Sequence, residues 1–66
     1  MKITFSPTPF GTVHVGTVVP AEEAVTARRK ISAQAGQRGY GRRISVREHR
    51  FGSLVRIGAI YPRSKV

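Results

Sequence analysis

Apolar and polar residues alternate over the first part of the chain, a pattern typical of β-strands that bury one face. Residues 2–5 form a short alternating segment, which the prolines that follow are expected to end. Residues 11–19 form a longer segment rich in β-branched side chains, with Val13, Val15 and Val19 on one face. The sequence therefore predicts two N-terminal strands joined by a proline-containing turn. The opposite face of the second strand would carry His14, Gly16 and Val18.

The residues that follow carry the signals of a helix over about residues 20–35. Pro20 suits the first turn of a helix, because the N–H that proline lacks would have no partner there. Glu22 and Glu23 would lie near the positive end of the helix dipole, and Gly36 is a candidate stop. The apolar side chains of this helix are mostly small, which suits close packing against a sheet. They are Ala21, Ala24, Val25, Ala27, Ile31 and Ala35.

Two further alternating segments, residues 42–50 and 53–61, flank Phe51 and Gly52 and predict a C-terminal β-hairpin over about residues 42–61. A two-residue turn at Phe51-Gly52 sets the pairing of the strands, and this register gathers the apolar side chains on one face. The predicted fold is α+β, with one helix packed on a small antiparallel sheet in the order ββαββ. The inner face would pair Glu48 with Val55, Val46 with Ile57, and Ile44 with Ala59.

The same register gathers arginines on the outer face of the hairpin. Arg47 would lie directly opposite Arg56, with Arg43 diagonal to them. Like charges directly opposite one another destabilise a sheet, which favours an anion bound across the pair. The alternative is a solvated face on which the side chains spread apart and salt screens charges beyond about 8–10 Å. The sequence leaves both interpretations open.

The distribution of charge along the chain strengthens the case for an anionic partner. Eleven of the twelve Lys and Arg residues follow position 27. Residues 1–27 have a formal net charge of −1, whereas residues 28–66 have a net charge of +10. Because such self-repulsion opposes a compact state, we expect a polyanionic partner, either nucleic acid or an acidic protein surface. Lys2 lies in the neutral part and is expected to play no role.

The length and composition limit what can hold the chain together. We expect residues 1–66 to form one small basic domain, with residues 62–66 as a flexible tail. The chain has no cysteine, which excludes a disulfide and a thiolate zinc site. A domain of this size then depends on a modest core alone, on a homodimer or on a bound partner. No apolar run suits a membrane span and the N-terminus lacks signal-peptide features, so we expect a cytoplasmic protein.

The segment after the predicted helix combines glycine, arginine and one tyrosine. Glycine lets a phosphate backbone approach closely, and Arg38, Arg42 and Arg43 would donate hydrogen bonds to phosphate oxygens. Tyr40 would either stack on a base or pack against the core, and both alternatives are open.

The predicted helix contributes a basic run of its own. Arg29 and Lys30 would point outward, either toward a phosphate backbone or only as charges that complement the helix dipole. Arg28, at the edge of the apolar face, would form a structural ion pair with Glu48, the one acidic residue after position 27. Glu48 would otherwise be hydrated at the end of the sheet.

The chain offers no constellation for catalysis. It has no aspartate, its three glutamates are the adjacent Glu22 and Glu23 and the distant Glu48, and its two histidines are isolated. An acid, a base and a nucleophile cannot be assembled from these residues. We therefore expect neither an enzyme, nor a metal, nor a cofactor.

The leading hypothesis is a small nucleic-acid-binding protein, with DNA favoured over RNA, because a two-stranded ribbon fits a major groove. The alternative is a small basic inhibitor or adaptor, such as a virus-encoded regulator, that docks on an acidic surface of a larger enzyme. A ribosome-associated protein is a third possibility. The residues predicted to contact the anionic partner are Arg29, Lys30, Arg38, Tyr40, Arg42, Arg43, Arg47 and Arg56.

Overall fold

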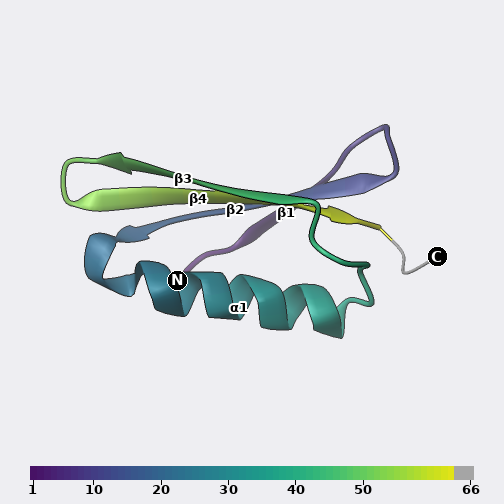
Figure 1. The fold of residues 1–66 in the computed structure, drawn as a ribbon, viewed down its shortest axis with the longest axis horizontal. Helices are drawn as coiled ribbons and strands as arrows, with labels where there is room; N and C mark the ends of the chain where they lie inside the picture. The colour runs from purple at the N-terminus through teal and green to yellow at the C-terminus, as the bar shows by residue number, and fades with distance from the viewer. Residues whose placement is uncertain (64–66) are drawn as a thin grey trace.

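The computed structural model describes residues 1–63, in which four strands form one antiparallel sheet and one α-helix lies along it (Figure 1). The α+β class, with one helix between two pairs of strands, is therefore confirmed. The elements are β1 (Thr4–Pro7), β2 (Thr12–Pro20), a 3₁₀ turn (Ala21–Glu23), α1 (Ala24–Gln37), β3 (Ser45–Phe51) and β4 (Leu54–Pro62).

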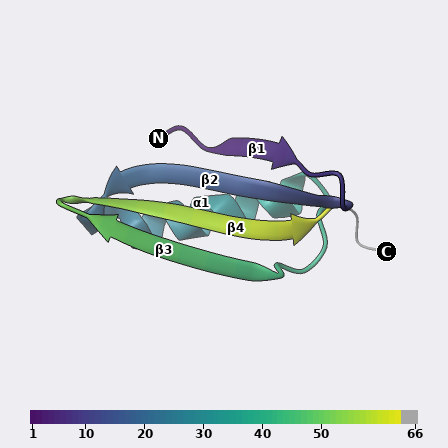
Figure 2. The same ribbon diagram turned by 90° about the horizontal axis from the view of Figure 1, so that it is seen from above.

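The strands are arranged across the sheet in the order β1-β2-β4-β3, so β4, the last strand in sequence, is one of the two central strands. The chain leaves β2, passes along one face of the sheet as α1, and returns as β3 at the far edge (Figure 2). This path leaves the opposite face without a covering element among residues 1–63. We call it the open face.

The core lies between α1 and the two central strands. Ala27, Ile31 and Ala35 are the buried residues of the helix, and their spacing places them on one side. They face alternate residues of β2 and β4, among which Val15 and Ile57 are fully buried. Two small alanines let the helix lie close to the sheet, as the sequence indicates. The other buried apolar residues are Val13, Val19, Val55, Ala59 and Tyr61.

The helix ends later than the sequence predicts. Gly36 lies inside α1, and Gly39 is instead the residue with a positive φ, at 77°. The Gly39 N–H donates to the Gly36 carbonyl at 3.1 Å, and the Tyr40 N–H donates to the Ala35 carbonyl at 3.1 Å. These two bonds form a Schellman motif, which requires the left-handed conformation at the glycine after the helix.

The turn of the C-terminal hairpin lies one residue later than predicted, at Gly52-Ser53. Phe51 pairs with Leu54, and Gly52 has a φ of 60°. A positive φ at the first central residue alone is the pattern of a type II′ turn, in which glycine occupies that position. The prediction that Phe51 and Gly52 form the turn is therefore wrong.

Moving the turn by one residue shifts the register by two positions. Glu48 pairs with Ile57 instead of Val55, and Val46 pairs with Ala59 instead of Ile57. Because side chains alternate with a period of two, each strand keeps its predicted inner and outer faces. Ile44 is an exception: it precedes β3 and is exposed, although its N–H donates to the Ile60 carbonyl at 2.8 Å.

The end of the chain is anchored as far as the structure describes it. Pro62 is the last residue of β4, and the Arg63 N–H donates to the Gly11 carbonyl at 3.0 Å. The rest of the predicted tail, residues 64–66, lies outside the described residues. Within residues 1–63, the structure contains no helix with the length and apolar character that crossing a membrane requires.

Candidate functional site

The open face carries the outward side chains of all four strands, and the register arranges them in rows across the sheet. One row runs Thr4, Gly16, Gly58, Arg47 from β1 to β3. The neighbouring row on one side contains His14 and Ile60, and the row on the other side contains Val18, Arg56 and His49. Each flanking row thus brings together residues that are far apart in the sequence.

The charges of the open face have one sign. Arg47 and Arg56 are exposed there, together with His14 and His49. None of the three acidic side chains of the chain lies on this face. Glu48 is on the helix side of β3, and Glu22 and Glu23 are in the 3₁₀ turn before α1. Arginine guanidinium groups without a competing carboxylate on the same face are available to an anionic ligand.

Arg47 and Arg56 do not face each other as the sequence predicts. Arg47 lies opposite Gly58, and Arg56 lies opposite His49, so the two arginines are diagonal neighbours. Diagonal positions are about 7–8 Å apart, which weakens the repulsion that direct opposition would produce. Both arginines remain on the outer face, because a shift of two positions preserves the side of the sheet on which they lie.

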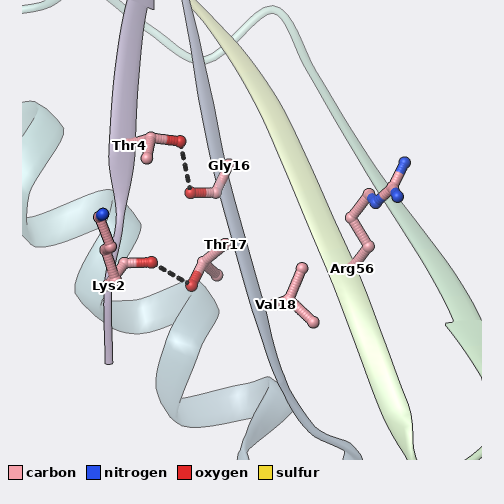
Figure 3. Close-up of a pocket in the computed structure, with 6 residues that line it drawn as sticks. All are labelled: Lys2, Thr4, Gly16, Thr17, Val18 and Arg56. Atoms are coloured by element: carbon pink, nitrogen blue, oxygen red, sulfur yellow. Dashed lines mark hydrogen bonds between the residues drawn. The ribbon is translucent and has the colours of Figure 1, made fainter.

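The paired glycines make a depression across the middle of the open face, which we call the glycine trough. Its first part, of about 450 Å³, lies over Gly16 between Lys2 and Thr4 on one side and Val18 and Arg56 on the other (Figure 3). Its second part, of about 240 Å³, continues over Gly58. The second part is lined by His14, Arg47, His49 and Arg56.

The β1 end of the trough is held by hydrogen bonds that Figure 3 shows as dashed lines. The Thr17 hydroxyl donates to the Lys2 carbonyl at 2.7 Å, and the Thr4 hydroxyl donates to the Gly16 carbonyl at 3.2 Å. Thr17 is buried, so its bond fixes the chain before β1 against the sheet. The Arg56 side chain extends from β4 toward β3 (Figure 3).

An aromatic and apolar area adjoins the trough near the hairpin turn. The rings of His49 and Phe51 stack with centroids 6.2 Å apart and an angle of 28° between planes. The Arg56 Cζ atom lies 6.0 Å from the centroid of the Phe51 ring. Phe51, Leu54 and Val18 are all exposed apolar side chains. A flat ring face beside cations is the arrangement on which unpaired bases stack.

The loop residues predicted for the site do not join the open face. Tyr40 is half-buried, with ring centroids 6.3 Å from Phe5 and 6.4 Å from Tyr61. Of its two open alternatives, packing against the core is therefore the one that occurs. The Arg38 Cζ atom lies 3.7 Å from the centroid of the Phe5 ring, a cation–π contact at the end of the helix.

The other predicted arginines lie on the helix side of the molecule. Arg43 and Arg29 line one hollow beside α1, together with Arg28. Arg42 and Arg43 line a second hollow near the end of the helix. Arg43 is thus not diagonal to Arg47 on the outer face, because β3 begins only at Ser45. Lys30 is exposed on α1.

The predicted ion pair between Arg28 and Glu48 has its Nη1 and Oε2 atoms 3.2 Å apart. The side chains are 43% and 37% exposed, respectively. At this exposure water screens the attraction, so the pair contributes only a modest stabilisation. The pair also neutralises part of the positive charge on the helix side. Within residues 1–63, no carboxylate neutralises the arginines of the open face in this way.

Several residues of the trough are not among those predicted from the sequence. Lys2 is predicted to play no role, but it lines the β1 end of the trough, across from Arg56. Gly16 and Gly58 form its floor. A glycine in the interior of a strand is a signal of close approach by a ligand or another backbone, and both glycines were visible in the sequence. Their pairing was not visible, because it depends on β4 lying beside β2.

Comparison of the chain with models of protein families, with curated proteins and with solved structures gives no match. The functional interpretation therefore rests on the geometry and chemistry of the site.

Proposed function

We propose that this protein binds nucleic acid through the open face of its sheet. The observation that carries the proposal is that the acidic side chains are confined to other parts of the molecule, which leaves the cations of the open face without a carboxylate beside them among the described residues. The open face presents Arg47 and Arg56 with two histidines, whereas every acidic side chain of the chain lies elsewhere. Phosphate contacts supply most of the affinity of such a surface, and they require cations that are not already paired with carboxylates.

The placement of β4 changes the mode of binding that the sequence indicates. The major groove of DNA is about 12 Å wide and admits a two-stranded ribbon. Here β2 pairs with β4 along its whole length, so the hairpin is part of a four-stranded sheet. The preference for DNA over RNA depends on a free two-stranded ribbon. Because the hairpin is part of a larger sheet, the proposal covers both DNA and RNA.

The test compares arginines on the two sides of the molecule. Arg47→Gln and Arg56→Gln remove charges from the open face, and Arg29→Gln removes the same charge from the helix side. We expect the first two variants to weaken binding of a fluorescently labelled oligonucleotide. Each should also lower the magnitude of the slope of log K against log salt by about 1. The measurement is a fluorescence anisotropy titration at several salt concentrations.

Arg29→Gln is the matched control, because it makes the same change in net charge on the face that carries Glu48. It should alter the affinity less than either open-face variant. If Arg29→Gln abolishes binding while Arg47→Gln and Arg56→Gln bind like the unmodified protein, the functional face is the helix and the proposal is wrong. All variants should unfold at similar urea concentrations, since these arginines are exposed.

A second candidate function has one observation in its favour, the free edge of β3. The sheet ends at β3, so its outer backbone groups could pair with a strand of another protein. A basic inhibitor or adaptor of an acidic enzyme would use this edge together with the nearby arginines. Failure of the unmodified protein to bind any oligonucleotide at low salt would favour this alternative.

A further inference from the structure

The two glycines of the trough are not required by the fold. Neither Gly16 nor Gly58 has a positive φ, whereas Gly11, Gly39 and Gly52 do. Gly16 and Gly58 are Cα partners in the two central strands, where a glycine weakens the sheet relative to residues with side chains. Their presence therefore needs an explanation other than backbone conformation.

Packing does not supply that explanation either. A Cβ atom at Gly16 would meet the Ile57 carbonyl oxygen at 3.7 Å and the Thr4 hydroxyl at 3.8 Å, which are ordinary contacts. At Gly58 it would meet the Nε2 atom of His14 at 3.4 Å, a tighter contact with a side chain on the surface. The chain could carry alanine at the first position without rearrangement. Because glycine has no side chain, the two glycines leave the floor of the trough open.

The dimensions of this floor suit one narrow ligand that crosses the strands. The flanking rows are separated by four residues along each strand, or about 13 Å between Cα positions. The trough runs from Lys2 at the β1 edge to Arg47 on β3, with Arg56 and His14 on opposite walls. Cationic side chains thus lie at both ends of the trough and on one wall.

We infer that the glycine trough holds a single strand of nucleic acid with unpaired bases, an inference that rests on the proposed function. In a duplex the faces of the bases are covered by stacking, so a duplex would offer only its phosphates to the side chains that line the trough. An unpaired strand offers base faces to the rings of His49 and Phe51 and phosphates to the arginines. Because the glycines of the floor carry no side chains, the nucleic-acid strand approaches the backbone of the sheet closely.

The test fills the trough without changing the charge. Gly16→Ala adds one methyl group and Gly16→Val adds a β-branched side chain that favours strand conformation. We expect both variants to unfold at an equal or higher urea concentration than the unmodified protein. Gly16→Val should bind a single-stranded oligonucleotide of about 12 nucleotides at least about tenfold more weakly, with the Gly16→Ala variant in between. Ser6→Val adds the same side chain to the open face outside the trough and is the matched control.

The probes are RNA and DNA single strands and a DNA duplex of the same sequence. Loss of single-strand binding in Gly16→Val, with duplex binding unchanged, supports the inference. If Gly16→Val binds both forms as the unmodified protein does, or if the duplex binds more tightly than the single strands, the trough is not the binding site and only the proposed function stands. If the unmodified protein binds none of these probes at low salt, both are overturned. A difference between the RNA and DNA probes identifies the sugar that the trough accepts.

Discussion

Removal of the one acidic side chain in the basic part of the chain should destabilise this protein more than removal of its ion-pair partner. Glu48 lies 3.2 Å from Arg28 and shares the inner face of β3 with Arg50. Arg28 in turn lines a hollow with Arg29 and Arg43. Glu48 is thus attracted by several cations, whereas Arg28 is attracted by one anion and repelled by its neighbours. The two partners of one ion pair therefore contribute differently.

The magnitude follows from the exposure of the pair. Ion pairs on the surface stabilise proteins by about 0.2–1 kcal/mol. We expect Glu48→Gln to lower the free energy of unfolding by about 1 kcal/mol, because the attraction to other cations is lost as well. Arg28→Gln should lower it by less than about 0.5 kcal/mol, because relief of repulsion offsets the lost pair. For a domain of 60–100 residues, about 1 kcal/mol corresponds to a shift in Tm of about 4–8 °C.

The assay is urea unfolding of the unmodified protein, both single variants and the double variant at low salt and in about 1 M NaCl, where the Debye length is about 3 Å. The difference between the two single variants should nearly vanish at high salt, with unchanged m-values. Equal losses for Glu48→Gln and Arg28→Gln at low salt would show that the pair acts in isolation. A difference that persists at high salt would also refute the electrostatic explanation.

Substitutions at two further positions test local features of the fold. Gly52→Ala places a side chain at a φ of 60° and should lower the free energy of unfolding by about 1–2 kcal/mol, whereas Gly52→Asn should be tolerated better, as measured by urea unfolding. The Tyr61 hydroxyl is buried without a hydrogen-bond partner among residues 1–63, and such a group costs about 1–3 kcal/mol. Tyr61→Phe should therefore leave the thermal midpoint unchanged or raise it, and a clear decrease would show that the hydroxyl has a partner in solution.

The alternation of side chains predicted most of what depends on local pattern. Val13, Val15 and Val19 are buried, and Arg47 and Arg56 point away from the helix, even though the register of the hairpin is shifted by two positions. An error of two leaves the faces intact, whereas an error of one would have reversed them. The turn itself could have been placed correctly, because Gly-Ser is a sequence that suits a type II′ turn.

Features that depend on the order of the strands could not be predicted in this way. Nothing in the local pattern indicates that β4 pairs with β2, since hydrogen bonding between strands is not specific for sequence. Tyr40 was ambiguous for the same reason, because its neighbours Phe5 and Tyr61 come from the two ends of the chain. The glycine trough depends on that pairing too, since neither glycine alone shows that the other lies beside it.

The strand order also explains how a chain with so uneven a charge distribution can build its site. Along the sequence, Lys2, His14 and Gly16 belong to the nearly neutral part, and Gly58 and Arg56 belong to the basic part. The pairing of β2 with β4 brings the two parts together at the centre of the sheet, so that the neutral part supplies half of the floor and one wall. Because β2 contributes no carboxylate to the open face, the positive charge of β3 and β4 is left uncompensated there. An anionic ligand that crosses the strands would contact both parts, and in doing so would reduce the repulsion within the basic part. Binding and folding should therefore be coupled: a ligand of the open face stabilises the domain most at low salt, where that repulsion is largest.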